Sequence, residues 1–99
     1  MGAVRMKIEL AHGRAYLTRT PCGWYLESIV VDEGYRNKGI GTKLMKKVTQ
    51  KCDSPIYLLA TSELGGDYQR LIRFYEKFGF EKRKQPRNDG VGFNYNMVR

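Results

Sequence analysis

The sequence predicts an α/β (or α+β) fold, a mixed central β-sheet with two helices in the order β-β-β-α-β-α-β-β. Three observations lead to this prediction. Residues 6–10 and 91–97 alternate apolar and polar side chains, as half-buried strands do. Residues 44–52 and 71–78 place apolar side chains on one side of a helix. Each helix lies between two strands, which favours right-handed crossovers and parallel neighbours in the middle of the sheet.

Three strands are expected before the first helix. Met6, Ile8 and Leu10 alternate with Lys7 and Glu9 in the first strand. The turn at residues 12–13 leads to a second strand at 15–17, which the turn "TPCG" at 20–23 closes. The aromatic and β-branched run "WYLESIVVD", residues 24–32, predicts a third, central strand. These strands are expected to pair in antiparallel hairpins.

The first helix is expected after a turn at residues 32–40, because Leu44, Met45, Val48 and Cys52 share one side of a helix. Pro55 ends it, since the residue before a proline avoids the helical region. A buried strand, "IYLLATS" at 56–62, should follow.

The second helix should open at residues 65–67, with Asp67 as the N-cap and Gly79 as a left-handed C-terminal cap. Its apolar side comprises Leu71, Ile72, Phe74, Tyr75 and Phe78. The strand "GFEKRK", the turn "QPRNDG" and the strand "VGFNYNMVR" complete the chain, the two strands as an antiparallel pair.

The composition suits a single domain, residues 1–99, with 41% hydrophobic and 28% charged residues. The net charge of +8 predicts an anionic partner: nucleic acid, an acidic surface or a phosphate-rich small ligand. Cys22 and Cys52 lack metal-type spacing, so no metal site or disulfide framework is expected. The amino terminus lacks a long apolar run, so we expect no signal peptide, no membrane span and a cytoplasmic location.

The turn "RNKGIG", residues 36–41, could hold a phosphate group. It follows a strand and precedes a helix, whose first N–H groups have no partner within the helix. Glycines there let a phosphate approach the backbone closely. A structural turn is the alternative. The spacing excludes the dinucleotide pattern, which needs a third glycine, and the P-loop, since Thr42 precedes Lys43.

Two motifs together resemble the GNAT acyltransferase superfamily. The stretch "VDEGYRNKGIGT", residues 31–42, is similar to its acetyl-CoA pyrophosphate loop, (Arg or Gln)-x-x-Gly-x-(Gly or Ala). The stretch "RLIRFYEKFGFEKR", residues 70–83, is similar to its second signature, a helix that ends in a tyrosine, two residues, an apolar residue and Gly-Phe. By motif the resemblance covers residues 24–83.

The resemblance implies acetyl-CoA as co-substrate and an N-acetyltransferase that moves the acetyl group to an amine by direct attack in a ternary complex. Tyr75 matches the tyrosine that protonates the departing thiolate. The third strand would pair with the pantetheine arm and stabilise the oxyanion through its main chain at Ile29, Val30 and Val31. The pyrophosphate would be held by main-chain N–H groups of Arg36, Asn37, Lys38, Gly39, Ile40, Gly41 and Thr42.

The sequence also departs from the family pattern. Tyr68 occupies a position where the family often has an asparagine that contacts the pantetheine or the substrate. Arg70 and Arg73 are expected near the nucleotide phosphates, or otherwise exposed to solvent. Typical members begin with a strand and two helices before the strand that we place at Met6. The chain is therefore a short member, and its acceptor site should be shallow or completed by another chain. We expect either a homodimer or a protein or polyamine-like acceptor that is reached across an open face.

The general base stays open between two carboxylates. Glu27 shares a strand face with Ile29 and Val31 by period-two counting, and Glu63 follows the next strand. His12 has a suitable intrinsic pKa but lies in a turn, where a surface histidine is expected. Two other functions remain: a small basic nucleic-acid-binding module and a CoA-binding protein without activity.

Overall fold

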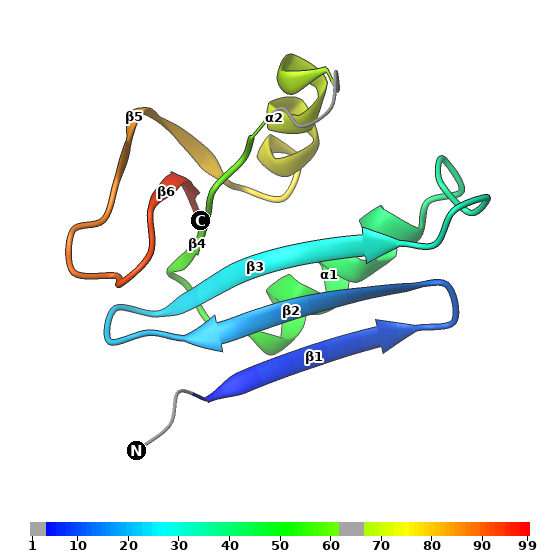
Figure 1. Cartoon of the computed structure of the whole chain (residues 1–99), viewed down its shortest axis with the longest axis horizontal. Helices are drawn as coiled ribbons and strands as arrows, with labels where there is room; N and C mark the ends of the chain where they lie inside the picture. The colour runs from blue at the N-terminus through cyan, green and yellow to red at the C-terminus, as the bar shows by residue number, and fades with distance from the viewer. Residues whose placement is uncertain (1–3, 62–66) are drawn as a thin grey trace.

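The computed structural model of the chain describes residues 4–61 and 67–99. It has one six-stranded sheet, in the order β1-β2-β3-β4-β6-β5, and two helices (Figure 1). The chain order of strands and helices is the one predicted from the sequence. The strands are β1 Arg5–Leu10, β2 Gly13–Arg19, β3 Trp24–Val31, β4 Ile56–Leu58, β5 Glu81–Arg87 and β6 Tyr95–Val98, and the helices are α1 Ile40–Lys51 and α2 Tyr68–Glu76.

The sheet is mixed because its two halves are connected differently. Strands β1, β2 and β3 form an antiparallel meander, and α1 carries the chain from β3 to β4, which pairs parallel to β3. Strand β6 then lies between β4 and β5 and is antiparallel to both. The parallel pairing in the middle and the antiparallel pairing of the last two strands are both as predicted.

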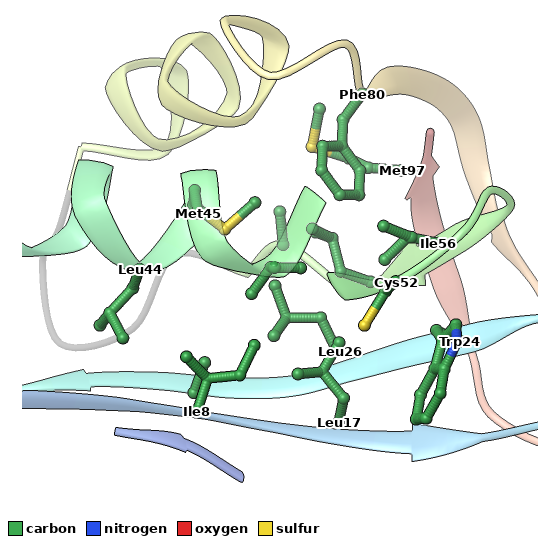
Figure 2. Packing of buried hydrophobic residues seen from close by; sticks show 14 of the residues in the cluster. Ile8, Leu17, Trp24, Leu26, Leu44, Met45, Cys52, Ile56, Phe80 and Met97 are labelled. Carbon is green, nitrogen blue, oxygen red and sulfur yellow. The ribbon is translucent and has the colours of Figure 1, made fainter. Parts of the chain in front are cut away.

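The main core lies between the sheet and the helices. Leu44, Met45 and Val48 of α1 are fully buried. Leu44 points from α1 toward the strands that carry Leu17 and Leu26 (Figure 2). Burial of a side chain of this size contributes about 1.5–3 kcal/mol. Ile72 of α2 and Phe80, which lies between α2 and β5, join the same cluster, so both helices cover one face of the sheet (Figure 2). In the described part of the chain neither helix is long and apolar enough to span a membrane.

The C-terminal half differs from the sequence prediction in its boundaries. Strand β5 extends to Arg87, through residues 85–87 that were predicted as a turn. The ladder shifts between Lys82, opposite Met97, and Arg87, opposite Tyr95, so the intervening residues bulge away from β6. Proline has no backbone N–H to donate to a neighbouring strand, and an edge strand tolerates Pro86 because no donor is needed at that position.

The last and the fourth strands are shorter than predicted. Strand β6 begins at Tyr95 rather than Val91, because Val91 folds back and packs with Tyr25 and Tyr95 in a second, small cluster. Phe93 stacks on Tyr25, with ring centroids 4.5 Å apart. Strand β4 ends at Leu58, where it diverges from β3.

Candidate functional site

Strands β3 and β4 separate in the middle of the sheet and leave one side of β3 open. Their parallel ladder ends at the pair Leu26 and Leu58, although β3 continues to Val31. Among the described residues, no strand pairs with this side of β3 beyond Leu26. Its main-chain groups there are free to pair with an extended ligand, as they would with another strand.

A β-bulge lies where the strands separate. Tyr16 pairs with Ser28 while Leu17 pairs with Leu26, so Glu27 is an extra residue in β3. A bulge changes the alternation of side chains along a strand. Both Leu26 and Ile29 consequently pack in the core, and the period-two count that placed Glu27 does not hold here. Glu27 is exposed and lines the groove described next, so its position follows from the structure rather than from the period-two count.

The groove between β3, the end of β4 and α2 has a volume of about 740 Å³. It brings together six of the residues named from the sequence, namely Glu27, Ile29, Arg36, Asn37, Arg70 and Tyr75. The other lining residues are Ser28, Leu59, Ala60, Thr61, Asp67, Leu71 and Phe74.

A smaller hollow of about 250 Å³ adjoins the groove at the glycine turn, and the two share Arg36, Asn37 and Phe74. It is also lined by Val31, Tyr35, Gly39, Ile40, Gly41 and Thr42. Three predicted residues line neither space. The side chains of Val30, Lys38 and Arg73 are exposed outside both, and Glu63 lies outside the described residues.

The glycine turn presents the start of α1 to this hollow. Asn37 and Gly39 are left-handed, with φ of 63° and 79°, and the Gly39 carbonyl accepts the Lys43 N–H at 3.1 Å. Gly39 is the N-cap residue, and no described side chain caps the helix. The N–H groups of Ile40, Gly41 and Thr42 therefore remain available to an anion.

Phe74 limits the space beside the turn. A Cβ atom placed on Gly41 would lie 3.4 Å from the Phe74 ring, which lines the same hollow. A larger side chain at position 41 would fill the space between α1 and α2. The backbone angles of Gly41 do not require glycine, and its Cβ position lies in ordinary contact with the Phe74 ring.

The entrance to the turn is fixed by charge and stacking. The Arg14 guanidinium donates to Asp32 Oδ1 at 2.7 Å. This hydrogen bond lowers the pKa of the Asp32 carboxyl and raises the pKa of the Arg14 guanidinium. His12 stacks on Tyr35 with ring centroids 3.5 Å apart and lies 3.7 Å from Asp32. His12 supports the turn and does not line the groove.

Tyr75 lies in the last turns of α2, and its ring is packed among other aromatic rings. Its centroid is 5.3 Å from that of Phe74 and 5.9 Å from that of Phe80, both in edge-on geometry. Burial raises the pKa of Tyr75 above the usual 10.0 of tyrosine. The phenol therefore keeps its proton at neutral pH, as a general acid must.

Asn96 shapes the groove, and sequence reasoning missed it. Its side chain accepts the Ala60 N–H at 2.7 Å and donates to the Ala60 carbonyl at 2.8 Å, as a neighbouring strand would. It also lies 3.5 Å from the hydroxyl of Tyr68. Asn96 thus connects the two walls of the groove, the end of β4 and the start of α2. A polar residue between Tyr95 and Met97 was expected to face solvent, so nothing local marked this role.

The described residues contain no cluster of His, Cys, Asp and Glu side chains that could hold a metal ion. The described residues that line the groove offer the phenol of Tyr75, carboxylates and guanidinium groups, together with main-chain donors.

Comparison with known proteins identifies the family. The model of the Acetyltransferase (GNAT) family matches residues 2–80. The chain belongs to this family. No curated protein matches the chain. Several solved structures share the fold of this GNAT protein, at identities too low to show more than the fold.

The anti-CRISPR protein AcrVA5 has 23% identity and a TM-score of 0.66, over 95% of each chain. A putative GNAT acetyltransferase from Bacteroides thetaiotaomicron has 21% identity and a TM-score of 0.70, over 96% of this chain and 60% of that one. Arabidopsis thaliana Naa50, solved with the bisubstrate analogue CoA-Ac-MVNAL, has 24% identity and a TM-score of 0.60, over 89% of this chain and 64% of that one. This GNAT chain thus spans about the full length of AcrVA5 and less than two thirds of the other two proteins.

Proposed function

We propose that this chain is an N-acetyltransferase that moves an acetyl group from acetyl-CoA to an amine by direct attack in a ternary complex. One observation carries the proposal: the groove lined by the open side of β3 and Tyr75 adjoins the hollow at the glycine turn, and the two share Arg36 and Asn37. Membership of an acetyltransferase family supports the same reaction class.

The residues of the turn suit the pyrophosphate of acetyl-CoA. The N–H groups at the start of α1 would donate to the phosphate oxygens, and the helix dipole favours negative charge there. Arg36 and Arg70 line the groove and add positive charge. The pantetheine arm would lie along the open side of β3, where Ile29, Val30 and Val31 offer main-chain groups.

The reaction needs a proton donor, a proton acceptor and support for negative charge. The amine nitrogen bonds to the thioester carbon as the carbon–sulfur bond breaks, and the electron pair of that bond leaves on sulfur. Tyr75 gives its proton to the thiolate. A main-chain N–H at the bulge of β3 would stabilise the charge that develops on the carbonyl oxygen.

The amine must lose a proton before or during attack. Glu27 is the candidate base that lines the groove within the described residues. Its exposure suits a base that passes its proton to solvent. Glu63 remains a second candidate.

The acceptor would enter from the open side of the groove. Thr61, Asp67 and Glu27 lie among its lining residues, with no helix described in front of them. An exposed site of this kind suits an amine on a protein or a polyamine-like molecule.

Binding and turnover test the proposal separately. Titration calorimetry should show acetyl-CoA binding, and a thiol-release assay over a panel of amines should identify acceptors. Gly41→Asp should abolish binding, because a carboxylate would occupy the hollow beside Phe74. Gln50→Glu is the matched control, since it adds a carboxylate to an exposed position of the same helix, outside both spaces.

The outcomes separate the remaining functions. Binding without thiol release on any amine would indicate a CoA-binding protein that lacks activity. An absence of binding at high micromolar acetyl-CoA would refute the proposal. The exposed Lys82, Lys84 and Arg87 of β5 favour nucleic acid as the second candidate ligand, and salt-sensitive retention on DNA would then support it.

A further inference from the structure

Strand β1 is an open edge of the sheet. It lies at one end of the strand order and, among the described strands, pairs only with β2 (Figure 1). The ladder between them is regular from Arg5 to Leu10, without a bulge. Long regular edges of this kind are templates for pairing with another strand.

The hydrogen bonds to β2 show which backbone groups face outward. The Arg19 N–H donates to the Val4 carbonyl at 2.7 Å, so these residues form a hydrogen-bonded pair. Such pairs alternate along an antiparallel ladder. Met6, Ile8 and Leu10 therefore bond to β2, and the N–H and C=O groups of Arg5, Lys7 and Glu9 point away from the sheet.

The outward residues are complementary to themselves. We propose that two copies of this chain pair through antiparallel β1 strands, with Ile8 opposite Ile8 at the two-fold axis. Lys7 then faces Glu9 of the second copy, and Glu9 faces Lys7, each as a hydrogen-bonded pair. Met6 faces Leu10 on the side of the helices. Every contact occurs twice, as a two-fold interface requires.

Charge specifies this register against its neighbours. With the axis at residue 7, Lys7 would face Lys7, although Arg5 would then face Glu9. With the axis at residue 9, Glu9 would face Glu9 and Lys7 would face the uncharged Ala11, so only the register about Ile8 pairs opposite charges without a like-charge contact. Like charges directly opposite each other are unfavourable, and opposite charges contribute about 0.2–1 kcal/mol per pair. Lys7 and Glu9 already lie 3.5 Å apart within one copy, so they are positioned on one face of the strand.

The space beside the edge is suitable for a second strand. A groove of about 500 Å³ runs along β1 and is lined by Met6, Lys7, Ile8, Glu9, Lys47 and Lys51. The partly buried Met6 and Leu10 would cover each other across the interface. The exposed Lys47 and Lys51 of each α1 can lay their methylene groups over this apolar row and keep the charges in water.

Pairing would join two six-stranded sheets into one. The groove of the functional site lies on the other side of β3, so it stays open in the pair. The inference therefore does not depend on acetyl transfer, and its failure would leave the proposed function untouched.

Charge exchange at the edge tests the interface. Light scattering after size-exclusion chromatography should give the wild-type chain twice its mass of 11.5 kDa at high micromolar concentration. Lys7→Glu alone and Glu9→Lys alone each turn two attractive contacts into two repulsive ones. Each should weaken the dimer by about 10-fold or more and run as a monomer.

An equimolar mixture of the two single variants should form a dimer again, because every pair then joins a carboxylate to an ammonium. Lys84→Glu is the control: it makes the same change of charge on β5, at the other end of the sheet, and this variant should dimerise as strongly as the wild-type chain. Both edge side chains are exposed, and circular dichroism should confirm folded variants. A wild-type monomer, dimers that persist in both single variants, or a mixture that stays monomeric would each overturn the proposal. Monomers that bind an acidic peptide at this edge would assign it to another partner.

Discussion

At the scale of single residues, Tyr75 has the most specific role in the proposed reaction. Tyr75→Phe removes the proton donor and keeps the ring, so acetyl-CoA should bind within about 2-fold of wild type while kcat falls about 100-fold or more. Stopped assays of thiol release and calorimetry would measure the two effects. Tyr57→Phe, in the second cluster, is the control and should leave kcat unchanged.

The pH profile adds a second test of Tyr75. A phenol donates its proton below its pKa, and burial moves this pKa above 10.0. The decline of kcat on the alkaline side should therefore be centred above pH 10 and be absent in Tyr75→Phe. A decline that is centred clearly below pH 10 and persists in Tyr75→Phe would assign the alkaline limb to another group.

Asn96 is predicted to stabilise the fold through its two bonds to Ala60. Asn96→Leu would leave the buried Ala60 N–H and C=O groups without partners, at a cost of about 2–4 kcal/mol. Urea unfolding should show this loss as a lower midpoint. Retention of the wild-type midpoint would mean that water or another strand replaces the amide.

At Thr18, unlike Asn96, removal of the polar group should not lower the stability of the fold. Its hydroxyl oxygen is buried and has no hydrogen-bond partner among the described residues. Thr18→Val removes this group with little change of shape, so the free energy of unfolding should stay level or rise by about 1 kcal/mol. A loss above about 1 kcal/mol in urea would show that the hydroxyl is satisfied in solution.

At the scale of elements, the entrance to the glycine turn depends on Asp32. Arg14 lowers the pKa of Asp32 below its unfolded value, so this carboxylate stabilises the fold above the unfolded pKa. The contribution is lost as pH falls through the folded pKa. Asp32→Asn should therefore lower the melting temperature near pH 7 and make it less sensitive to acid than in wild type.

Asp53→Asn, an exposed carboxylate after α1, is the control and should keep the wild-type acid dependence. If Asp32→Asn and wild type lose the same number of degrees between pH 7 and pH 3, the ion pair with Arg14 contributes nothing.

Local sequence patterns predicted the elements but not their irregularities. The stripe of Leu44, Met45 and Val48 defined α1, and Asp67 was identified as the N-cap of α2, whose side chain accepts the Arg70 N–H. The order of strands followed from alternation and turns. These features depend on residues a few positions apart.

Irregular features depend on residues far apart in the chain. The bulge at Glu27 exists because of its pairing with β2, and the ladder shift in β5 because of its pairing with β6. Asn96 bonds to Ala60 across 36 positions. The motifs therefore located the turn and Tyr75, while the open side of β3 and the support of the groove required the sheet.

At the scale of the whole molecule, the functional groove joins two halves. One half contains β1, β2, β3 and α1, and the other contains β4, β5, β6 and α2. The sheet connects them through only the short ladder of β3 and β4. Acetyl-CoA in the groove would contact the turn in the first half and α2 in the second, and so would stabilise both against unfolding together.

The melting temperature should therefore rise strongly with acetyl-CoA. A ligand at about 100 times its Kd adds about 2.7 kcal/mol to the stability of the form that binds it. For a domain of this size that corresponds to a shift of about 10 °C, measured by scanning calorimetry. Gly41→Asp should lose the shift, and Tyr75→Phe should keep it, because it retains binding. A shift that survives Gly41→Asp would place the ligand elsewhere on the surface, away from the glycine turn.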